Sequence, residues 1–545
     1  MRKNVRSIFC SNLFIYLFSV GLSICQTNLI AQNNSASDSE VGAVFHYSQF
    51  ITRNDIKNHI AILASDSLEG RGFGAKGSFK AGEYIASQLR YENLQALGDR
   101  GTYFQPVLVN KWNREKANFN INSVTGLLKY SLVPGQDFTF TPGDIPAEVN
   151  FSIDHFMFCG YGIFDEKYSD YQYAQVRNEV IMIMEGEPVK DKKSIITNTI
   201  NPSKWKNDLK AKLEVAVLKG AKAVIVLVDS TKFIKRTPDQ FLKANLFTDD
   251  LKIKFKIPVI YLNESSLPGM LNQKELKRLK RFISNVKKGK VSSNYISANF
   301  KVSLSSKSST VRDRNIVARI EGSDPELKKE YLVVSAHFDH LGVVEGKIYN
   351  GADDNGTGTA ALISLAKALN ALKENKYPLK RSILFLFCTG EEVGLLGSKY
   401  FVQNPLVPLK DIKADINIDM IGRGDDTHEE NENYVYVIGS DKINPLLDRK
   451  IRENNSWSVN YKLDYTYNDI QHPMRLYYRS DHYNFAERGI PSVFLFGGFH
   501  KDYHKPDDDP IFINYRKVED ISKLVYFTLI DLANHPGEIM TKYTE

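Results

Sequence analysis

The sequence has few cysteines and no apolar run long enough to span a bilayer. Only four of its 545 residues are cysteine, and two of them, Cys10 and Cys25, lie within the first thirty residues. The other two, Cys159 and Cys388, sit in apolar strand-like runs, which predicts buried thiols and no disulfide framework. The chain must therefore be stabilised by its core, and its 42% hydrophobic and 25% charged residues are typical of a globular protein.

The first residues have the composition of a secretory leader. Three basic residues precede the apolar run 8–24, and Ala31 offers a small residue at a cleavage point. The run is interrupted by serine and asparagine and is shorter than the ~20 residues that a span needs. We predict a signal peptide over residues 1–32 and a secreted or periplasmic protein. A lipid anchor at Cys25 is the weaker alternative, because the bulky Ile24 stands where lipidation favours a small residue.

The charge balance argues against a nucleic-acid-binding protein. The formal net charge is +7, and removal of the three basic residues of the leader leaves +4, which is a mild excess. A basic amphipathic helix predicted at residues 274–290 is best interpreted as a solvated surface helix. We expect no nucleic-acid partner and no stable membrane span, and the sequence does not define the oligomeric state.

The rest of the chain divides into three regions by pattern. Residues 45–144 begin with two amphipathic helical segments, and we assign them to the N-terminal part of the main domain. Between these helices, Gly72–Gly77 formally matches G-x-G-x-x-G, but the match follows a helix instead of a strand, so we interpret it as a glycine-rich turn. Residues 145–298 contain short apolar strands and predict an inserted module. Residues 299–540 form the remaining, catalytic part.

From residue 315 onward, strand-like and helix-like segments alternate. Apolar strands are predicted at 315–320, 331–336, 382–388, 414–420, 434–438 and 492–496. Helices are predicted between or after them, including 358–372 and 518–534. This alternation predicts an α/β fold with a mostly parallel, mixed central sheet that is flanked by helices.

Most of these strands are followed by imidazole or carboxylate side chains. The candidates are His337, Asp339, Asp353, Glu391, Glu392, Asp419, Tyr503 and His504. The carboxyl ends of parallel strands meet at one edge of a sheet, so we expect these side chains to lie close together. Two histidines with several carboxylates and no thiolate form a donor set that suits zinc.

The number of candidate ligands predicts two zinc ions per chain. Five side chains are too many ligands for one open catalytic site: His337, Asp353, Glu392, Asp419 and His504. If one carboxylate bridges, each ion has three protein ligands, and such ion pairs activate water for hydrolysis. Glu391 is then predicted as the general base that takes the proton of the water. Asp339 is predicted to orient the imidazole of His337.

Six motifs in this region occur in an order that resembles a known family. They are HFDH, NGADDNGTG, CTGEEVGLLGS, INIDMIG, SDHYNFAERGIPSVFLFGG and DYHKPDDD, and they resemble those of the M28 family of zinc aminopeptidases over residues 315–534. The helical start is similar to the N-terminal part of the longer members. The module at 145–298 resembles the protease-associated (PA) domain that those members carry.

The resemblance implies a role for each candidate residue. His337 and Asp419 would be terminal ligands of one ion, Glu392 and His504 would be terminal ligands of the other, and Asp353 would bridge. A cis peptide bond is expected between Asp353 and Asp354, and Tyr503 would donate a hydrogen bond to the oxyanion. The implied protein is an exported di-zinc aminopeptidase with the zinc aminopeptidase (phosphorylase/hydrolase-like) fold. Its substrates would be peptides with a free N-terminus, hydrolysed by a metal-activated water.

Two related activities stay open at this point. A carboxypeptidase or dipeptidase of the same fold needs a cation for the substrate carboxylate, and Arg423, Arg475 or Arg479 could supply it. A glutaminyl cyclase would use a related fold with a single zinc ion. Four other histidines of this region are interpreted as surface or core residues: His340, His428, His472 and His482.

Overall fold

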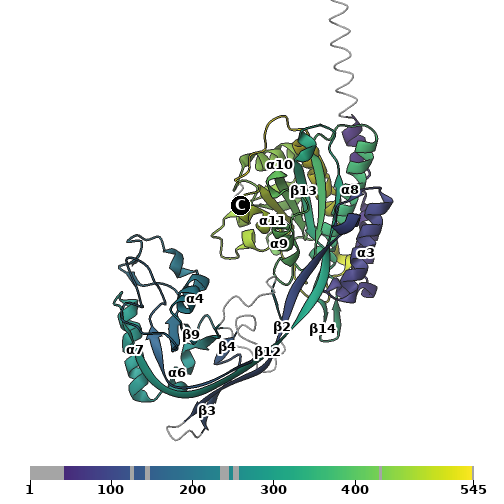
Figure 1. The fold of residues 1–545 in the computed structure, drawn as a ribbon. Helices are drawn as coiled ribbons and strands as arrows, with labels where there is room; N and C mark the ends of the chain where they lie inside the picture. Colours follow the sequence, from purple (N-terminus) through teal and green to yellow (C-terminus); the bar gives the residue numbers. More distant parts are fainter. Residues whose placement is uncertain are drawn as a thin grey trace, which may run out of the picture. The chain divides into compact units, whose positions relative to one another are not determined.

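The computed structural model describes residues 42–122, 128–140, 148–233, 245–248, 257–428 and 432–542. The predicted signal peptide and Cys25 lie outside these residues. The chain folds into two compact units, of which unit 1 comprises residues 1–107 and 312–545 and unit 2 comprises Leu108–Val311 (Figure 1). No helix among the described residues is both long and apolar enough to cross a membrane.

Unit 1 is built on a mostly parallel sheet with helices on both faces, which confirms the predicted fold class. Its central strands follow the order β18-β20-β17-β13-β16-β12, and the four strands from β20 to β16 are mutually parallel. Their bounds are β12 Ser293–Ile320, β13 Tyr331–His337, β16 Ser382–Cys388, β17 Ile412–Asp419, β18 Tyr434–Ile438 and β20 Ser492–Phe496. All side chains of β13, β16 and β20 are buried, as expected for strands covered on both faces.

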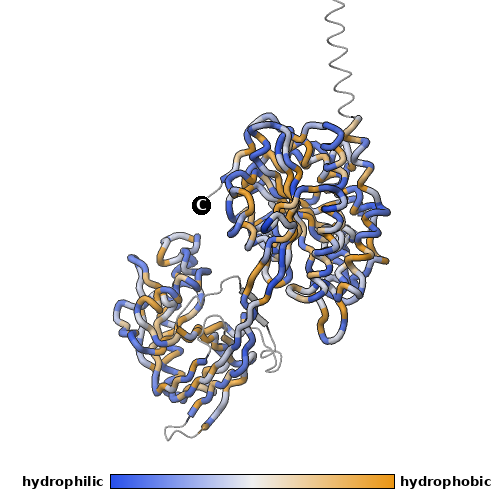
Figure 2. Tube along the Cα trace, turned by 45° about the vertical axis from the view of Figure 1, so that its right-hand side comes forward, coloured by the Kyte–Doolittle hydropathy of each residue, from blue (hydrophilic) through white to orange (hydrophobic). Residues whose placement is uncertain are grey.

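Two sets of helices cover the sheet of unit 1. The alternate strand residues Leu332, Val334 and Ala336 face one set, whereas Tyr331 and Val333 face the other. The helices of the first face are α2 Arg53–Leu63, α3 Lys76–Tyr91, α8 Gly358–Glu374, α10 Pro445–Trp457 and α12 Tyr515–Asn534. Those of the second face are α9 Leu396–Gln403 and α11 His482–Glu487. Figure 2 shows the hydrophobic segments gathered inside the unit.

Unit 2 has its own smaller sheet and core. Strands β5, β6, β9 and β11 are parallel neighbours, and the N-terminal part of β12 pairs antiparallel with β5. The bounds in this unit are β3 Leu128–Leu132, β4 Phe138–Phe140, β5 Glu148–Cys159, β6 Val180–Met184, β9 Ala223–Val228, β10 Asn245–Thr248, β11 Val259–Asn263, α4 Leu209–Leu218, α6 Leu267–Met270 and α7 Gln273–Lys287. Helices α6 and α7 pack on one face of the sheet and α4 packs on the other.

Unit 2 is wider at both ends than the predicted module 145–298. Strand β2 (Phe104–Asn122) and strand β12 each contribute residues to both units, and β2 pairs with β3 and β10 within unit 2. The sequence pattern did not reveal this extension, because the extended ribbons carry few of the apolar runs by which the module was recognised. The two cysteines among the described residues, Cys159 in unit 2 and Cys388 in unit 1, are free and buried, as predicted.

Candidate metal site

The strand order of unit 1 brings the predicted residues to one edge of the sheet. His337 is the last residue of β13 and Asp419 is the last residue of the adjacent β17. Glu391 and Glu392 follow β16, on the other side of β13, after a short turn. His504 lies in the segment that follows β20. Residues from four strand ends therefore meet, because neighbouring parallel strands end at the same edge.

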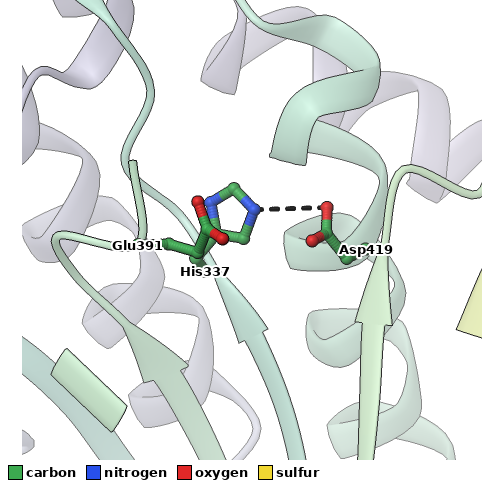
Figure 3. Close-up of side chains that lie close together, drawn as sticks. All are labelled: His337, Glu391 and Asp419. Atoms are coloured by element: carbon green, nitrogen blue, oxygen red, sulfur yellow. Dashed lines mark hydrogen bonds and ion pairs between the residues drawn. The ribbon is translucent and has the colours of Figure 1, made fainter. Parts of the chain in front are cut away.

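The first group of donors surrounds His337 (Figure 3). Its Nε2 lies 3.2 Å from Oδ1 of Asp419 and 3.5 Å from Oδ1 of Asp354, while the carboxylate of Glu391 is within metal-binding reach of both His337 and Asp419. The other ring nitrogen, Nδ1, lies 3.2 Å from the backbone oxygen of Asp339 and 3.8 Å from its carboxylate. The ring is thus held with Nε2 directed at the carboxylates.

The second group of donors surrounds Glu392. Its Oε2 lies 3.1 Å from Nε2 of His504, and its Oε1 lies 2.8 Å from Nδ1 of His340. Oδ2 of Asp354 is 3.2 Å from Nε2 of His504 and 3.7 Å from Nδ1 of His340. Asp354 therefore presents one carboxylate oxygen to each group, which is the arrangement of a shared ligand.

The structure corrects the prediction for Asp353. Its Oδ1 accepts hydrogen bonds from the backbone N–H of Gly422 at 2.7 Å and from the hydroxyl of Thr357 at 2.9 Å. It is not a member of either donor group, whereas Asp354 belongs to the second group and also faces His337 of the first. The cis peptide bond lies between Asp354 and Asn355, so the predicted position between Asp353 and Asp354 is wrong.

Sequence reasoning also missed His340, which was interpreted as a surface or core histidine. The side chain is fully buried, and Nε2 has no hydrogen-bond partner among the described residues. The spacing of His337 and His340 at the end of one strand was a usable signal. No comparable signal separates Asp353 from Asp354, because both are acidic and both precede α8.

The other predicted residues lie at or beside these groups. Asp339 is fully buried and accepts a hydrogen bond from the backbone N–H of Glu391 at 3.2 Å. The ring of Tyr503 stacks on that of His504 with centroids 3.8 Å apart, and its hydroxyl accepts a hydrogen bond from Arg479 at 3.4 Å. Asp419 is held by the hydroxyl of Ser480 at 2.7 Å.

A pocket opens onto both donor groups within unit 1. Its polar wall contains Glu391, Arg479 and Tyr503 beside the donor groups. Its apolar wall is formed by Met420, Leu476, Phe494, Phe496 and Phe499. The chemistry of the cluster is therefore reachable by a ligand that has both polar and apolar parts.

The electrostatics of the donor groups fit bound cations. Burial raises the pKa of Asp354, and the charge of Glu392 raises it further. Burial raises the pKa of Glu391 well above its usual range, against the opposing charge of His337. Burial lowers the pKa of His504, but hydrogen bonds to Asp354 and Glu392 outweigh it and raise the pKa to about 10. Carboxylates packed this closely require positive charge, and imidazole with carboxylate oxygen is a donor set that suits zinc.

Comparison with known proteins agrees with this class of site and fold. Residues 315–529 match the sequence profile of peptidase family M28. This part of the chain belongs to that family, as the motifs predicted.

Two curated relatives extend the similarity beyond the matched region. The probable leucine aminopeptidase 2 of Aspergillus oryzae is 27% identical over 42% of this chain and 47% of its own length. Aminopeptidase YwaD of Bacillus subtilis is 26% identical over 56% of each protein. The chain thus spans about half the length of these relatives.

One solved structure shares the fold over most of the chain. The aminopeptidase from Aneurinibacillus sp. strain AM-1 aligns with a TM-score of 0.51 and 17% identity, covering 92% of this chain and 98% of that one. This likeness concerns the α/β architecture.

Proposed function

We propose that the protein is an exported zinc metallo-aminopeptidase that removes N-terminal residues from peptides. The observation that carries the proposal is the pair of donor groups that share Asp354, with Glu391 beside them and an open pocket in front. Membership of a peptidase family supports it, and so do the aminopeptidase names of the curated relatives. Export rests on the leader-like residues 1–32, and the assignment of unit 2 as a PA domain rests on the motif resemblance.

The donor groups would hold two zinc ions. His337 and Asp419 would bind one ion, Glu392 and His504 would bind the other, and Asp354 would be shared between them. Zinc supplies Lewis acidity toward a peptide carbonyl and lowers the pKa of water.

Glu391 is the residue best placed to move the proton. Its carboxylate lies within reach of the first donor group and lines the pocket, and it is not needed to complete either set of three ligands. It would accept a proton from the attacking water and return it to the nitrogen of the leaving amine. The backbone of Glu391 is held by Asp339, which also faces the imidazole of His337.

Tyr503 would bind the oxygen on which negative charge develops. Its hydroxyl lies in the pocket wall, where the oxygen accepts a hydrogen bond from Arg479. The O–H hydrogen is therefore free to point at a ligand. Stacking on His504 fixes the plane of the ring next to the second donor group.

A dipeptidase or carboxypeptidase is the second candidate, because one of the three predicted cations lines the pocket. Arg423 is paired with Asp502 at 2.9 Å, and Arg475 lies over the ring of Tyr478 at 4.7 Å. Arg479 instead lines the pocket wall, between Phe499 and Tyr503. A free substrate carboxylate could bind there in a short peptide. The single-zinc glutaminyl cyclase alternative is disfavoured by the two complete donor groups.

The test is purification of the full chain, metal analysis and a substrate panel. We expect close to two zinc ions per chain, hydrolysis of aminoacyl-arylamides and of peptides with a free N-terminus, and no hydrolysis of N-acylated peptides. Cleavage of N-acylated peptides at the C-terminus would support the carboxypeptidase instead. One zinc ion per chain with cyclisation of N-terminal glutamine would support the cyclase.

A further inference from the structure

The glycine-rich turn that follows α2 contains a fully buried arginine. The turn spans Asp66–Ala75, begins with the 3-10 segment Asp66–Arg71 and leads into α3. Arg71 is 0% exposed. Its φ of +53° is the left-handed conformation that residues other than glycine rarely adopt. Such a conformation persists where surrounding contacts require it, so the contacts of Arg71 indicate its role.

The guanidinium group binds only backbone carbonyl oxygens in the part of the chain that is described. Its Nε donates to Phe338 at 2.6 Å, and its Nη2 donates to Gly351 at 2.8 Å. Its Nη1 donates both to Asn350 at 2.7 Å and to Leu63 at 2.5 Å. One rigid planar group thus joins three separate segments by four hydrogen bonds.

Two of these segments carry the donor groups. Phe338 lies directly after His337, in the loop that ends at His340. Asn350 and Gly351 lead directly into the turn that carries Asp354. The same guanidinium therefore ties the backbone of the His337 loop to the backbone of the shared carboxylate.

The glycines of the turn let it approach these loops closely. A Cβ on Gly72 would lie 3.0 Å from Cα of Gly342, and a Cβ on Gly70 would lie 2.3 Å from the backbone oxygen of Tyr349. Gly72 also forms a backbone bridge with His340. This contact explains the sequence EGRG. Gly70 and Gly72 allow the backbone of the turn to lie against the loops, and Arg71 between them donates hydrogen bonds to the carbonyl groups of those loops.

We propose that Arg71 is a positioning residue of the metal site, which sets the distance between His337 and Asp354 and so the affinity for the ions. The inference rests on the proposed metal site. The positive charge of Arg71 also lies near the carboxylates, since Asp339, Asp354, Asp508 and Glu392 each raise its pKa against the larger effect of burial.

Arg381 provides a matched control. It is also fully buried, and it donates to the carbonyl oxygens of Leu532, His535 and Gly537 as well as to Glu330. It stands at the start of β16, at the opposite end of that strand from Glu391. Loss of its hydrogen bonds should therefore destabilise unit 1 without disturbing the donor groups.

The experiment compares the full-length wild type with Arg71→Lys and Arg381→Lys. Equilibrium dialysis with zinc, the absorption spectrum of the cobalt-loaded protein and thermal unfolding of the metal-free protein are measured for each. A lysine ammonium group cannot make the four hydrogen bonds of the planar guanidinium group. We therefore expect Arg71→Lys to raise the zinc Kd at least tenfold and to shift the absorption bands of the cobalt-loaded protein. Arg381→Lys should lower the Tm yet keep the Kd within twofold.

Three outcomes would overturn the inference. The first is a zinc Kd for Arg71→Lys within twofold of wild type, and the second is an equal loss of affinity in Arg381→Lys. If Arg71→Lys does not fold, Gly72→Ala replaces it, because this variant keeps the arginine and pushes the turn away from Gly342. The third outcome is an unchanged zinc Kd in Gly72→Ala. A wild-type protein that binds no zinc would instead refute the proposed function, so the two failures are distinguishable.

Discussion

The two units of this protein use the same local architecture for different ends. Both contain four neighbouring parallel strands, β16-β13-β17-β20 in unit 1 and β5-β6-β9-β11 in unit 2. In each set some strands are buried on both faces, namely β13, β16 and β20 in unit 1 and β6 and β9 in unit 2. Both also contain buried carboxylates, such as Asp354 in unit 1 and Asp170 in unit 2. A parallel sheet with a buried acid is therefore not by itself a sign of a site.

The surroundings of the two carboxylates are what differ. Asp170 accepts hydrogen bonds from the backbone N–H groups of Tyr161 and Ile163 at 3.0 Å and from the hydroxyl of Tyr168 at 2.8 Å. It is satisfied by neutral donors, as a structural residue should be. Asp354 faces His337, His504 and another carboxylate, Glu392. Like charges brought together in the interior need a compensating cation, and this separates a site from a structural contact.

The strongest test of this comparison is Glu391→Gln. If strand-end acids of unit 1 perform chemistry, the variant should lose hydrolysis by about 10²–10⁴-fold, because the amide cannot accept a proton. Bound zinc should stay at the wild-type amount, since Glu391 is not assigned as a ligand. Kinetics with an aminoacyl-arylamide and metal analysis measure the two effects. Activity near the wild-type level would show that another residue is the base.

Two matched variants test whether Asp354, and not Asp353, is the ligand shared by the two donor groups. Asp354→Asn should weaken zinc binding by at least about tenfold, because it removes charge from a carboxylate that faces both groups. Asp353→Asn should weaken it less and act mainly through the contacts with Gly422 and Thr357. Zinc titration of both variants measures the two affinities. A larger loss of affinity in Asp353→Asn than in Asp354→Asn would mean that Asp353 is the shared ligand.

Metal removal should affect the units unequally. Ions present at about 100 times their Kd stabilise the folded state by about 2.7 kcal/mol, and chelation removes this. Hydrogen exchange followed by mass spectrometry should show faster exchange in the unit 1 segments 331–340 and 412–420. Exchange in the unit 2 segment 223–228 should not change. Equal acceleration in both units would mean that the comparison is wrong.

The smallest expected effect is that of Asp170→Asn in unit 2. Burial raises the pKa of Asp170 to about 6, above the value of about 4 for an unfolded chain. The folded state therefore binds the proton more tightly, and this contribution to stability is present below pH 4 and is lost as the pH rises to 6 and above.

We expect the variant to remove this pH dependence and to cost about 1–3 kcal/mol of unfolding free energy through its weaker hydrogen bonds. Denaturant unfolding between pH 4 and 7 measures both effects. Hydrolysis should be unaffected at pH 7. A loss of activity without loss of stability would contradict the structural role assigned to Asp170.

Much of unit 1 could be predicted from the sequence because its strands are fully buried. The predicted strands 382–388, 434–438 and 492–496 coincide with β16, β18 and β20, since continuous apolar runs have few other stable placements. The boundaries of unit 2 could not be predicted, because β2 and β12 are long ribbons that pair with strands distant in the sequence, β2 with β10 and β12 with β5.

The sequence alone determined the types of donor and the strand ends that carry them. It named His337, Glu391, Glu392, Asp419 and His504 because several strand ends or the loops after them each offer an imidazole or a carboxylate to the same edge of the sheet. It chose Asp353 as the shared ligand where the structure favours Asp354, it interpreted His340 as a surface or core histidine, and it gave no role to Arg71.

Only the tertiary structure decided those points, for a physical reason. The direction of a side chain in an irregular turn depends on backbone dihedral angles, and distant contacts hold them. Asp508 accepts hydrogen bonds from the N–H groups of both aspartates, and Arg71 holds the residues before them. Which carboxylate faces the histidines is thus set by residues that are remote in the sequence.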